Sequence, residues 1–214
     1  MVQLVATRPS IANHFLKELR DEVIQKDRGR FRRNLQRLGE IMAVEISKTL
    51  PYREEQVVTP LGVTRLQTLA EHPVLITILR AGLPYFEGFQ HYFDESDCGF
   101  IGAYRQEGTG EISIKLDYLA TPHLEGRIVI LIDPMLATGK SVTDAITVLL
   151  KKGKPAHVHI VALVAAPEGL RHLDQHLPVP HTVWAFAQDE KLDSRSYIVP
   201  GLGDAGDLSF GEKT

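Results

Sequence analysis

The chain has 214 residues, of which 43% are hydrophobic and 24% charged, and its formal net charge is -3. These values are typical of globular proteins and exclude disordered and fibrous classes. Cys98 is the single cysteine, so intrachain disulfides and thiolate-rich zinc sites are excluded. No run approaches the roughly 20 apolar residues that span a membrane. We therefore expect a soluble, cytoplasmic protein that is not exported.

The N-terminal third predicts two helices and a hairpin. Apolar residues at helical spacing indicate helices over 10–23 and 31–50, on either side of the basic segment 26–33. Pro51 ends the second helix, and 55–65 indicates a short hairpin that turns at 60–62.

From position 74 onward, strands and helices alternate. The strands are predicted at 74–79, 99–104, 128–132, 157–166 and 182–187, and the helices at 84–92, 142–152 and 168–176. Strands that alternate with helices predict an α/β fold, here one domain with an open, mostly parallel sheet and helices on both faces.

Two segments fall outside this alternation. The segment 105–124 is polar, contains Gly108 and Gly110, and is too long for an ordinary connection, which suggests a lid or a disordered insert. The tail, about 197–211, carries four glycines with Asp204 and Asp207 between them. Glycines let a backbone approach a ligand closely, so the tail is either a frayed end or a binding loop.

The stretch 128–141, IVILIDPMLATGKS, predicts an anion site. A buried strand runs into Asp133, and a turn of small residues, 137–141, opens a helix at the strand's carboxyl end. A nucleoside-triphosphate P-loop would need glycine at 134, where the chain has Pro134. A shorter phosphate cradle and a plain strand-helix turn remain open. Arg80 follows another strand and could bind phosphate at the same edge.

Histidines and arginines suggest two further sites. His157 and His159 alternate on a strand, and His172 and His176 lie one helical turn apart, but the sequence places no third metal ligand beside them. Solvated or buried histidines are the commoner case. A basic cluster could bind RNA or a nucleotide, or form a solvated helix face or a subunit contact. It consists of Arg28, Arg30, Arg32, Arg33 and Arg37.

Three motifs resemble the uracil phosphoribosyltransferase family: LRAGL at 79–83, DPMLATG at 133–139 and YIVPGLGDAGD at 197–207. The similarity also includes FR at 31–32, TPLG at 59–62 and AAPEG at 165–169. The resemblance implies one type I phosphoribosyltransferase domain over 1–214, which joins uracil to phosphoribosyl pyrophosphate to give UMP and pyrophosphate. Mg²⁺ would be carried by phosphoribosyl pyrophosphate and have no direct protein ligand. The segment 105–124 would be a mobile lid, and 197–211 a hood loop that binds uracil.

The resemblance also assigns residues. Phosphoribosyl pyrophosphate would bind Arg80, Arg105, Asp133, Pro134, Met135, Leu136, Ala137, Thr138, Gly139, Lys140, Ser141 and Asp204. Uracil would bind Ile198, Gly203, Asp204 and Ala205, and catalysis would depend on Asp204, Arg105 and Asp133. When pyrophosphate leaves, the ribose becomes oxocarbenium-like, so arginines and Mg²⁺ would neutralise the leaving group and a closed lid would exclude water.

Two residues depart from the family pattern. Lys140 stands where a second glycine is usual, and would be strained by roughly 1 kcal/mol if that position required positive φ. Asp193 replaces an asparagine. The alternatives are a regulator of the same fold that binds nucleotides and RNA, and an enzyme for another base. We expect no membrane or nucleic-acid partner and a homodimer or homotetramer; GTP activates some members of the family.

Overall fold

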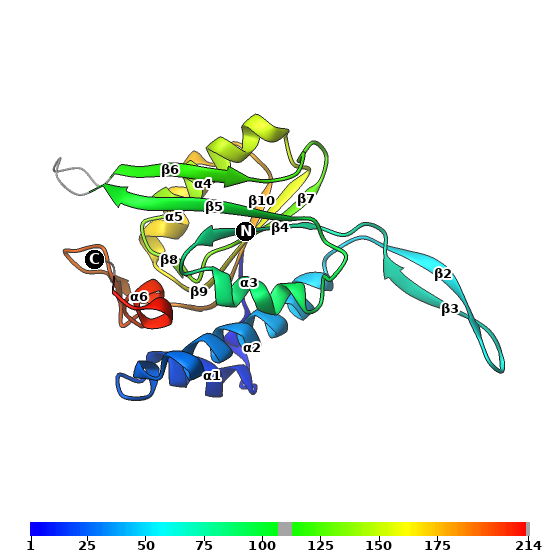
Figure 1. Cartoon of the computed structure of the whole chain (residues 1–214), viewed down its shortest axis with the longest axis horizontal. Helices are drawn as coiled ribbons and strands as arrows, with labels where there is room; N and C mark the ends of the chain where they lie inside the picture. Colours follow the sequence, from blue (N-terminus) through cyan, green and yellow to red (C-terminus); the bar gives the residue numbers. More distant parts are fainter. Residues whose placement is uncertain (107–112, 213–214) are drawn as a thin grey trace.

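The computed structural model describes residues 1–106 and 113–212, without the side chains of 103–106 and 113–117. Its centre is an eight-stranded sheet in the order β1-β10-β9-β7-β4-β5-β6, with β8 paired to β9 (Figure 1). The strands are β1 (Val2–Leu4), β4 (Val74–Leu79), β5 (Cys98–Gln106), β6 (Ser113–Ala120), β7 (Ile128–Ile132), β8 (Met135–Leu136), β9 (His157–Ala165) and β10 (His181–Gln188). All pairings are parallel except β5 with β6, so the predicted fold class is confirmed.

Helices cover both faces of this sheet. One face packs against α1 (Ala12–Arg20), α2 (Arg28–Ser47) and α3 (Leu83–Gln90), and the other against α4 (Lys140–Leu149) and α5 (Pro167–His176). Successive side chains of a strand point to opposite faces, so Ile130 and Ile132 belong to the first core and Val129 and Leu131 to the second. Burial on both faces explains why the central strands are continuously aliphatic.

Two glycines let α2 and α3 cross closely. A Cβ atom at Gly39 would collide with the carbonyl oxygen of Tyr85, and one at Gly88 with that of Gln36 and, at 2.8 Å, with the Glu40 nitrogen. The backbones therefore meet without intervening side chains. This contact fixes α3, whose N-terminus follows the Arg80 turn.

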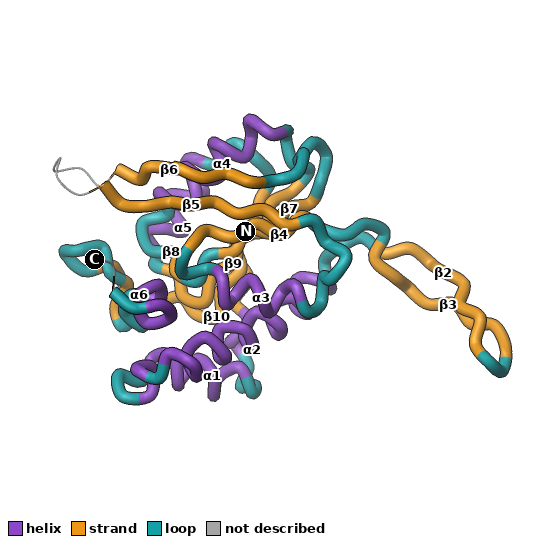
Figure 2. The backbone as a smooth tube through the Cα atoms, viewed as in Figure 1, coloured by secondary structure: helices purple, strands orange, loops and turns teal. Residues whose placement is uncertain are grey.

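A hairpin of β2 (Tyr52–Thr59) and β3 (Gly62–Leu69) projects away from the body (Figure 2). It is longer than the predicted 55–65 but turns at the predicted place. The pairing is in register along its whole length, from Tyr52 with Leu69 to Thr59 with Gly62. Most of its side chains are exposed.

Several elements differ from the sequence predictions. The basic segment is helical, because α2 starts at Arg28 and the Asp27 carboxylate accepts the Arg30 N–H at 3.0 Å. Part of the predicted lid is strand β6, whereas 107–112 lies outside the described residues. The short elements β1, β8, β11 (Lys191–Leu192), β12 (Ile198–Val199) and α6 (Ala205–Phe210) were not predicted. Three 3₁₀ turns complete the fold: Val5–Thr7, Ile24–Lys26 and Leu150–Lys152.

Within the described part of the chain, no helix has both the length and the apolar character needed to cross a membrane.

Candidate active site

A pocket of about 680 Å³ opens at the carboxyl ends of β4 and β7, where the tail covers the sheet edge. Parallel α/β sheets bind ligands at this edge. Its lining comes from three segments, the turn after β4, the loop after β7 and the tail. These residues are Ile78, Leu79, Arg80, Ala81, Asp133, Met135, Leu136, Ala137, Thr138, Gly139, Ser141, Val142, Ser196, Tyr197, Ile198, Gly203, Asp204, Ala205, Gly206, Asp207 and Glu212.

The loop after β7 ends in a tight turn that begins α4. Gly139 is the N-cap residue, with φ 80°, a conformation that favours glycine. The Thr138 hydroxyl accepts the Lys140 N–H at 3.4 Å, and the Thr143 hydroxyl donates to the Gly139 carbonyl oxygen at 3.1 Å. Lys140 is the first residue of α4 and does not have positive φ, so the strain considered for a lysine here is absent.

Helix α5 packs directly against this loop. A Cβ atom at Gly169 would collide with the carbonyl oxygen of Ala137, and one at Gly139 would lie 3.0 Å from the carbonyl oxygen of Gly169. The two backbones are therefore in direct contact. This close approach explains the glycine in the AAPEG motif, and it holds the 137–141 turn against α5.

Asp133 lies in the middle of the pocket and titrates unusually. Burial raises the pKa of its carboxyl to about 7, although the Met135 N–H donates to Oδ1 at 3.3 Å and opposes the rise. The negative charge of Asp204 raises the pKa of Asp133 further. A cation or a hydroxyl donor beside these two carboxylates would favour the ionised form of Asp133.

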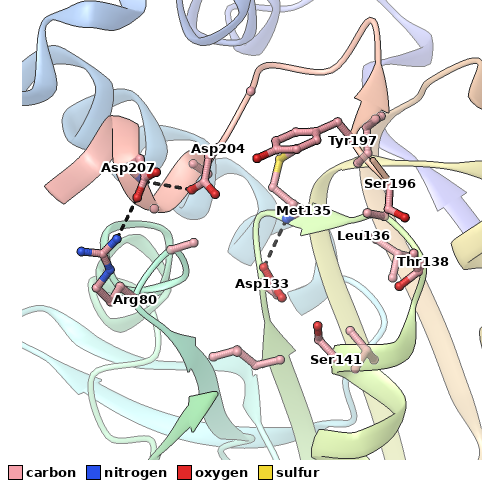
Figure 3. Close-up of a pocket in the computed structure, with 18 of the residues that line it drawn as sticks. Arg80, Asp133, Met135, Leu136, Thr138, Ser141, Ser196, Tyr197, Asp204 and Asp207 are labelled. Carbon is pink, nitrogen blue, oxygen red and sulfur yellow. Dashed lines mark hydrogen bonds and ion pairs between the residues drawn. The ribbon is translucent and has the colours of Figure 1, made fainter. Parts of the chain in front are cut away.

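The opposite wall is an ion pair. Arg80 donates to Asp207 at 2.9 Å, and Asp204 accepts the Asp207 N–H at 2.9 Å as the N-cap of α6. Figure 3 shows this group on one side of the pocket and Thr138 and Ser141 on the other, with Asp133 between them. An arginine thus faces the anion-suited turn across the cavity. The Leu79–Arg80 peptide bond is cis.

Gly82 follows this arginine and is required by packing. A Cβ atom there would lie 2.8 Å from the Ile78 carbonyl oxygen and 2.9 Å from that of Ile132. The LRAG turn therefore sits directly against the strand that ends in Asp133. The spacing of the two turns is fixed by this backbone contact.

The tail is ordered by its own hairpin. Asp193, at the β11–β12 turn, accepts the N–H groups of Arg195 and Tyr197 with Oδ1, each at 2.8 Å. These contacts need one acceptor oxygen, so aspartate serves here as an asparagine would. The bond from Tyr197, the larger cause, and that from Arg195 lower the pKa of Asp193.

The family model for uracil phosphoribosyltransferase matches residues 6–212. The chain belongs to the uracil phosphoribosyltransferase family. A uracil phosphoribosyltransferase of Porphyromonas gingivalis is 45% identical over 205 residues, which are 95% of each chain. One of Malacoplasma penetrans is 40% identical over 191 residues, 89% of this chain and 91% of its own. A solved structure from Aquifex aeolicus has a TM-score of 0.87 and 32% identity, covering 99% of this chain and 98% of its own.

Most residues assigned from the resemblance to this family line one pocket. They are Arg80, Asp133, Met135, Leu136, Ala137, Thr138, Gly139, Ser141, Ile198, Gly203, Asp204 and Ala205. Pro134 is buried and Lys140 is exposed, and neither contributes to the lining. Arg105 lies in β5, but its side chain is outside the described residues. The roles given to these residues remain predictions.

Nine other lining residues had no individual role assigned from the sequence, among them Ser196, Tyr197, Asp207 and Glu212, although Tyr197 and Asp207 belong to the tail that was expected to bind uracil. Asp207 could have been found, because it is the second aspartate of GDAGD and lies three residues after Asp204, within reach of a helix N-terminus. Ser196 has φ 64°, which nothing in its residue type announces.

The histidine pairs have other partners. His157 bonds to the Thr182 hydroxyl at 3.0 Å, and buried His159 accepts the Trp184 indole N–H at 3.0 Å. The ring of His172 stacks on that of His176. Among the described residues, no three His, Cys, Asp or Glu side chains are placed to hold a metal ion.

Three of the five arginines of the basic cluster on α2 have partners elsewhere in the described chain. Arg30 pairs with Glu18, Arg32 donates to the Ser209 carbonyl oxygen at 2.7 Å, and Arg37 lies over the Phe15 ring. These arginines therefore hold α1 and α6 against α2. The hypothesis of an RNA-binding face depended on this cluster and gains no support.

Proposed function

We propose that this chain transfers the 5-phosphoribosyl group from phosphoribosyl pyrophosphate to uracil, giving UMP and pyrophosphate in pyrimidine salvage. The observation that carries this proposal is the meeting of DPMLATG, LRAG and PGLGDAGD around one cavity. These segments are more than 40 residues apart in the sequence. Membership of the family supports the reaction, and the cavity lined by these motifs supports its location.

The loop from Asp133 to Ser141 would hold the ribose and its 5′-phosphate. The turn at Gly139 leads into α4, so main-chain N–H groups and the helix dipole favour an anion there. The Thr138 and Ser141 hydroxyls line the same wall. Asp133, deeper in the pocket, would accept hydrogen bonds from the ribose hydroxyls once it is ionised.

Arg80 would bind the pyrophosphate, and Arg105 would join it from β5. A guanidinium suits a phosphate because it donates in pairs and stays charged. The carboxylates of Asp133, Asp204, Asp207 and Glu212 add oxygen donors of the kind that Mg²⁺ prefers. As the family resemblance implies, Mg²⁺ would be carried by phosphoribosyl pyrophosphate without a direct protein ligand, and it would neutralise the leaving group beside these carboxylates.

Uracil would lie between Ile198 and Gly203-Asp204-Ala205, recognised mainly by main-chain groups. A base with a different donor and acceptor edge, such as cytosine, would leave buried groups unpaired at about 1 to 3 kcal/mol each. The segment 105–124, which includes β6 and continues through 107–112 outside the described residues, would close over the substrates and exclude water.

The test is direct. Purified protein with Mg²⁺, uracil and phosphoribosyl pyrophosphate should release pyrophosphate and form UMP, measured by a coupled pyrophosphate assay and by chromatography. Cytosine and hypoxanthine in place of uracil should give little product. No pyrophosphate release with uracil, or a preference for another base, would contradict the proposed function.

We also propose that the enzyme forms a homodimer or homotetramer through the β2–β3 hairpin. The hairpin exposes Val58 by 77%, Leu61 by 100% and Val63 by 62%, and Val58 pairs directly with Val63. Apolar side chains on a projecting arm are covered when the arm packs on a second copy of the same chain.

A cytoplasmic location fits the single cysteine and a substrate that carries several charged phosphates. Activation by GTP stays a prediction from the family resemblance.

A further inference from the structure

A buried ion pair outside the pocket connects three distant parts of the chain. Arg20 is the last residue of α1, and Asp189 follows β10 directly. Arg20 Nη1 donates to Asp189 Oδ2 at 2.9 Å, and Nη2 donates to Oδ1 at 2.8 Å. The Asp189 side chain is only 6% exposed and that of Arg20 22%. Neither residue lines the pocket.

The same pair holds both polar groups of one residue in the tail. The Gly201 N–H donates to Asp189 Oδ2 at 2.9 Å, and the Gly201 carbonyl oxygen accepts from Arg20 Nη1 at 3.0 Å. Gly201 has φ 59°, and a Cβ atom there would collide with the Ile198 carbonyl oxygen. One ion pair therefore fixes the orientation of this residue on both of its polar sides.

Gly201 lies between the two halves of the proposed uracil site, Ile198 on one side and Gly203 to Ala205 on the other. Gly203 has φ 92°, and only one atom, in the Leu208 side chain, would lie within 4 Å of a Cβ there. Gly203 itself is exposed, whereas Leu202 and Ala205 on either side of it are buried in the core. The buried side chains of Ile198 and Leu202 anchor this part of the loop, and the bonds to Gly201 set the orientation of the main chain between them.

Stability alone does not explain such a pair. Replacing a buried ion pair by apolar residues of similar size is often neutral or stabilising, because desolvation offsets the attraction between the charges. Apolar residues, however, would leave the Gly201 N–H and carbonyl oxygen without partners. The charged groups are needed for the loop that they hold.

We propose that Arg20 and Asp189 are positioning residues for the base: they hold Gly201 so that the main-chain groups of 198–205 select uracil. The proposal rests on the proposed function. It assigns to α1, an element remote from the chemistry, a share in base selection.

The test compares the kinetics of the parent protein with those of a double variant that carries both Arg20→Met and Asp189→Leu. We expect the fold to persist and the KM for uracil to rise at least about tenfold, the factor that corresponds to one net hydrogen bond. The KM for phosphoribosyl pyrophosphate should change less than twofold. A loss of general packing would alter both constants or the melting temperature, whereas displacement of the base loop alters the uracil constant selectively.

Asp189→Asn and Arg20→Lys provide milder changes if the double variant does not fold. Each keeps one hydrogen bond to Gly201 and should raise the KM for uracil less than the double variant does. The matched control is Arg30→Met with Glu18→Leu, which removes another arginine–carboxylate pair, joining α1 and α2 away from the pocket. It should leave the KM for uracil unchanged.

An unchanged KM for uracil in the folded Arg20 and Asp189 variants would overturn the proposal, as would an equal rise in the control. The unsubstituted protein is assayed first with uracil and with other bases. Inactivity of this parent with uracil contradicts the proposed function, and the positioning role is then measured with whichever base it uses.

Discussion

The Asp204 carboxylate both caps α6 and lines the pocket, and two substitutions separate these tasks. Asp204→Ala removes the acceptor for the Asp207 N–H and should lower the free energy of unfolding by about 1 kcal/mol. Asp204→Asn keeps an acceptor oxygen and should leave stability unchanged. Both should lower kcat/KM roughly 10- to 100-fold, because both remove the charge.

Thermal unfolding and the pyrophosphate assay measure the two effects on the same samples. Activity of Asp204→Asn equal to that of the parent would show that the charge is not needed, and activity of Asp204→Ala equal to that of the parent would show that the base pocket is misplaced. A similar loss of stability in both variants would contradict the capping role.

Asp133 predicts a pH dependence of stability. Its pKa is about 7 in the folded protein, against an ordinary value of 3.8, so between these values the folded state binds more protons than the unfolded state. Its contribution to stability is therefore full below about pH 4 and is lost as the pH rises to 7, by at most about 1.4 kcal/mol per pH unit.

His159 acts in the opposite direction. Burial lowers its pKa to about 4 from an ordinary 6.5, so stability rises with pH over that window. The two slopes partly cancel in the parent, and the difference between parent and Asp133→Asn isolates the aspartate. Melting temperatures from pH 4 to 8 should show that Asp133→Asn gains stability relative to the parent as the pH rises. A constant difference would mean that Asp133 has an ordinary pKa.

The contact of α5 with the 137–141 turn, which we propose binds phosphate, can be tested by adding one methyl group. In Gly169→Ala, the new Cβ must push against the Ala137 carbonyl oxygen, so the loop or the helix has to shift. We expect a loss of about 1 to 3 kcal/mol in stability and a several-fold higher KM for phosphoribosyl pyrophosphate. The KM for uracil should change less.

Gly88→Ala is the matched control, because it introduces an equally close contact between α2 and α3, outside the pocket. It should destabilise the protein by a similar amount without changing the KM for phosphoribosyl pyrophosphate. Equal kinetic effects of the two substitutions would mean that the loss comes from general destabilisation and not from the displaced loop.

Elements with a clear apolar pattern, periodic or continuous, could be predicted from the sequence. The strand 128–132 agrees with the structure at both ends, because continuous burial on two faces permits only aliphatic residues. Two-residue strands such as β11 and β12 carry too few residues for a period. β6 carried an alternating signal at Ile114, Leu116 and Tyr118, but the neighbouring glycines favoured an irregular segment.

If the β2–β3 hairpin forms the dimer interface, charged residues introduced on the hairpin should dissociate the dimer. The double variant Val58→Lys with Val63→Glu removes the apolar face but keeps an attractive cross-strand pair, so the hairpin itself should persist. Light scattering after size-exclusion chromatography should show a mass reduced to that of one chain. Tyr92→Glu, an exposed apolar position on the body, serves as the control.

A parent that is already monomeric, or a double variant with the parent's mass, would contradict the role of the hairpin. Loss of assembly in Tyr92→Glu alone would place the interface on the body.

Contacts between distant segments could not be predicted from composition or period. Arg20 and Asp189 are 169 residues apart, and nothing local to either marks it as the partner of the other. The resemblance located all three motifs of the pocket, since a motif preserves its own spacing. It did not reveal that α1 reaches the tail, because that contact depends on how the strands are ordered in the sheet.

The Arg80–Asp207 pair also has a consequence for how a substrate enters. Its guanidinium already has a carboxylate counter-ion at 2.9 Å, so binding of pyrophosphate there is an exchange of one anion for another. A ligand with a single weak charge gains little from displacing Asp207, whereas a pyrophosphate brings several negative oxygens that the planar guanidinium fork can bind in pairs. If Arg80 binds pyrophosphate as proposed, the substrate must therefore displace Asp207 before it gains the full charge of this arginine.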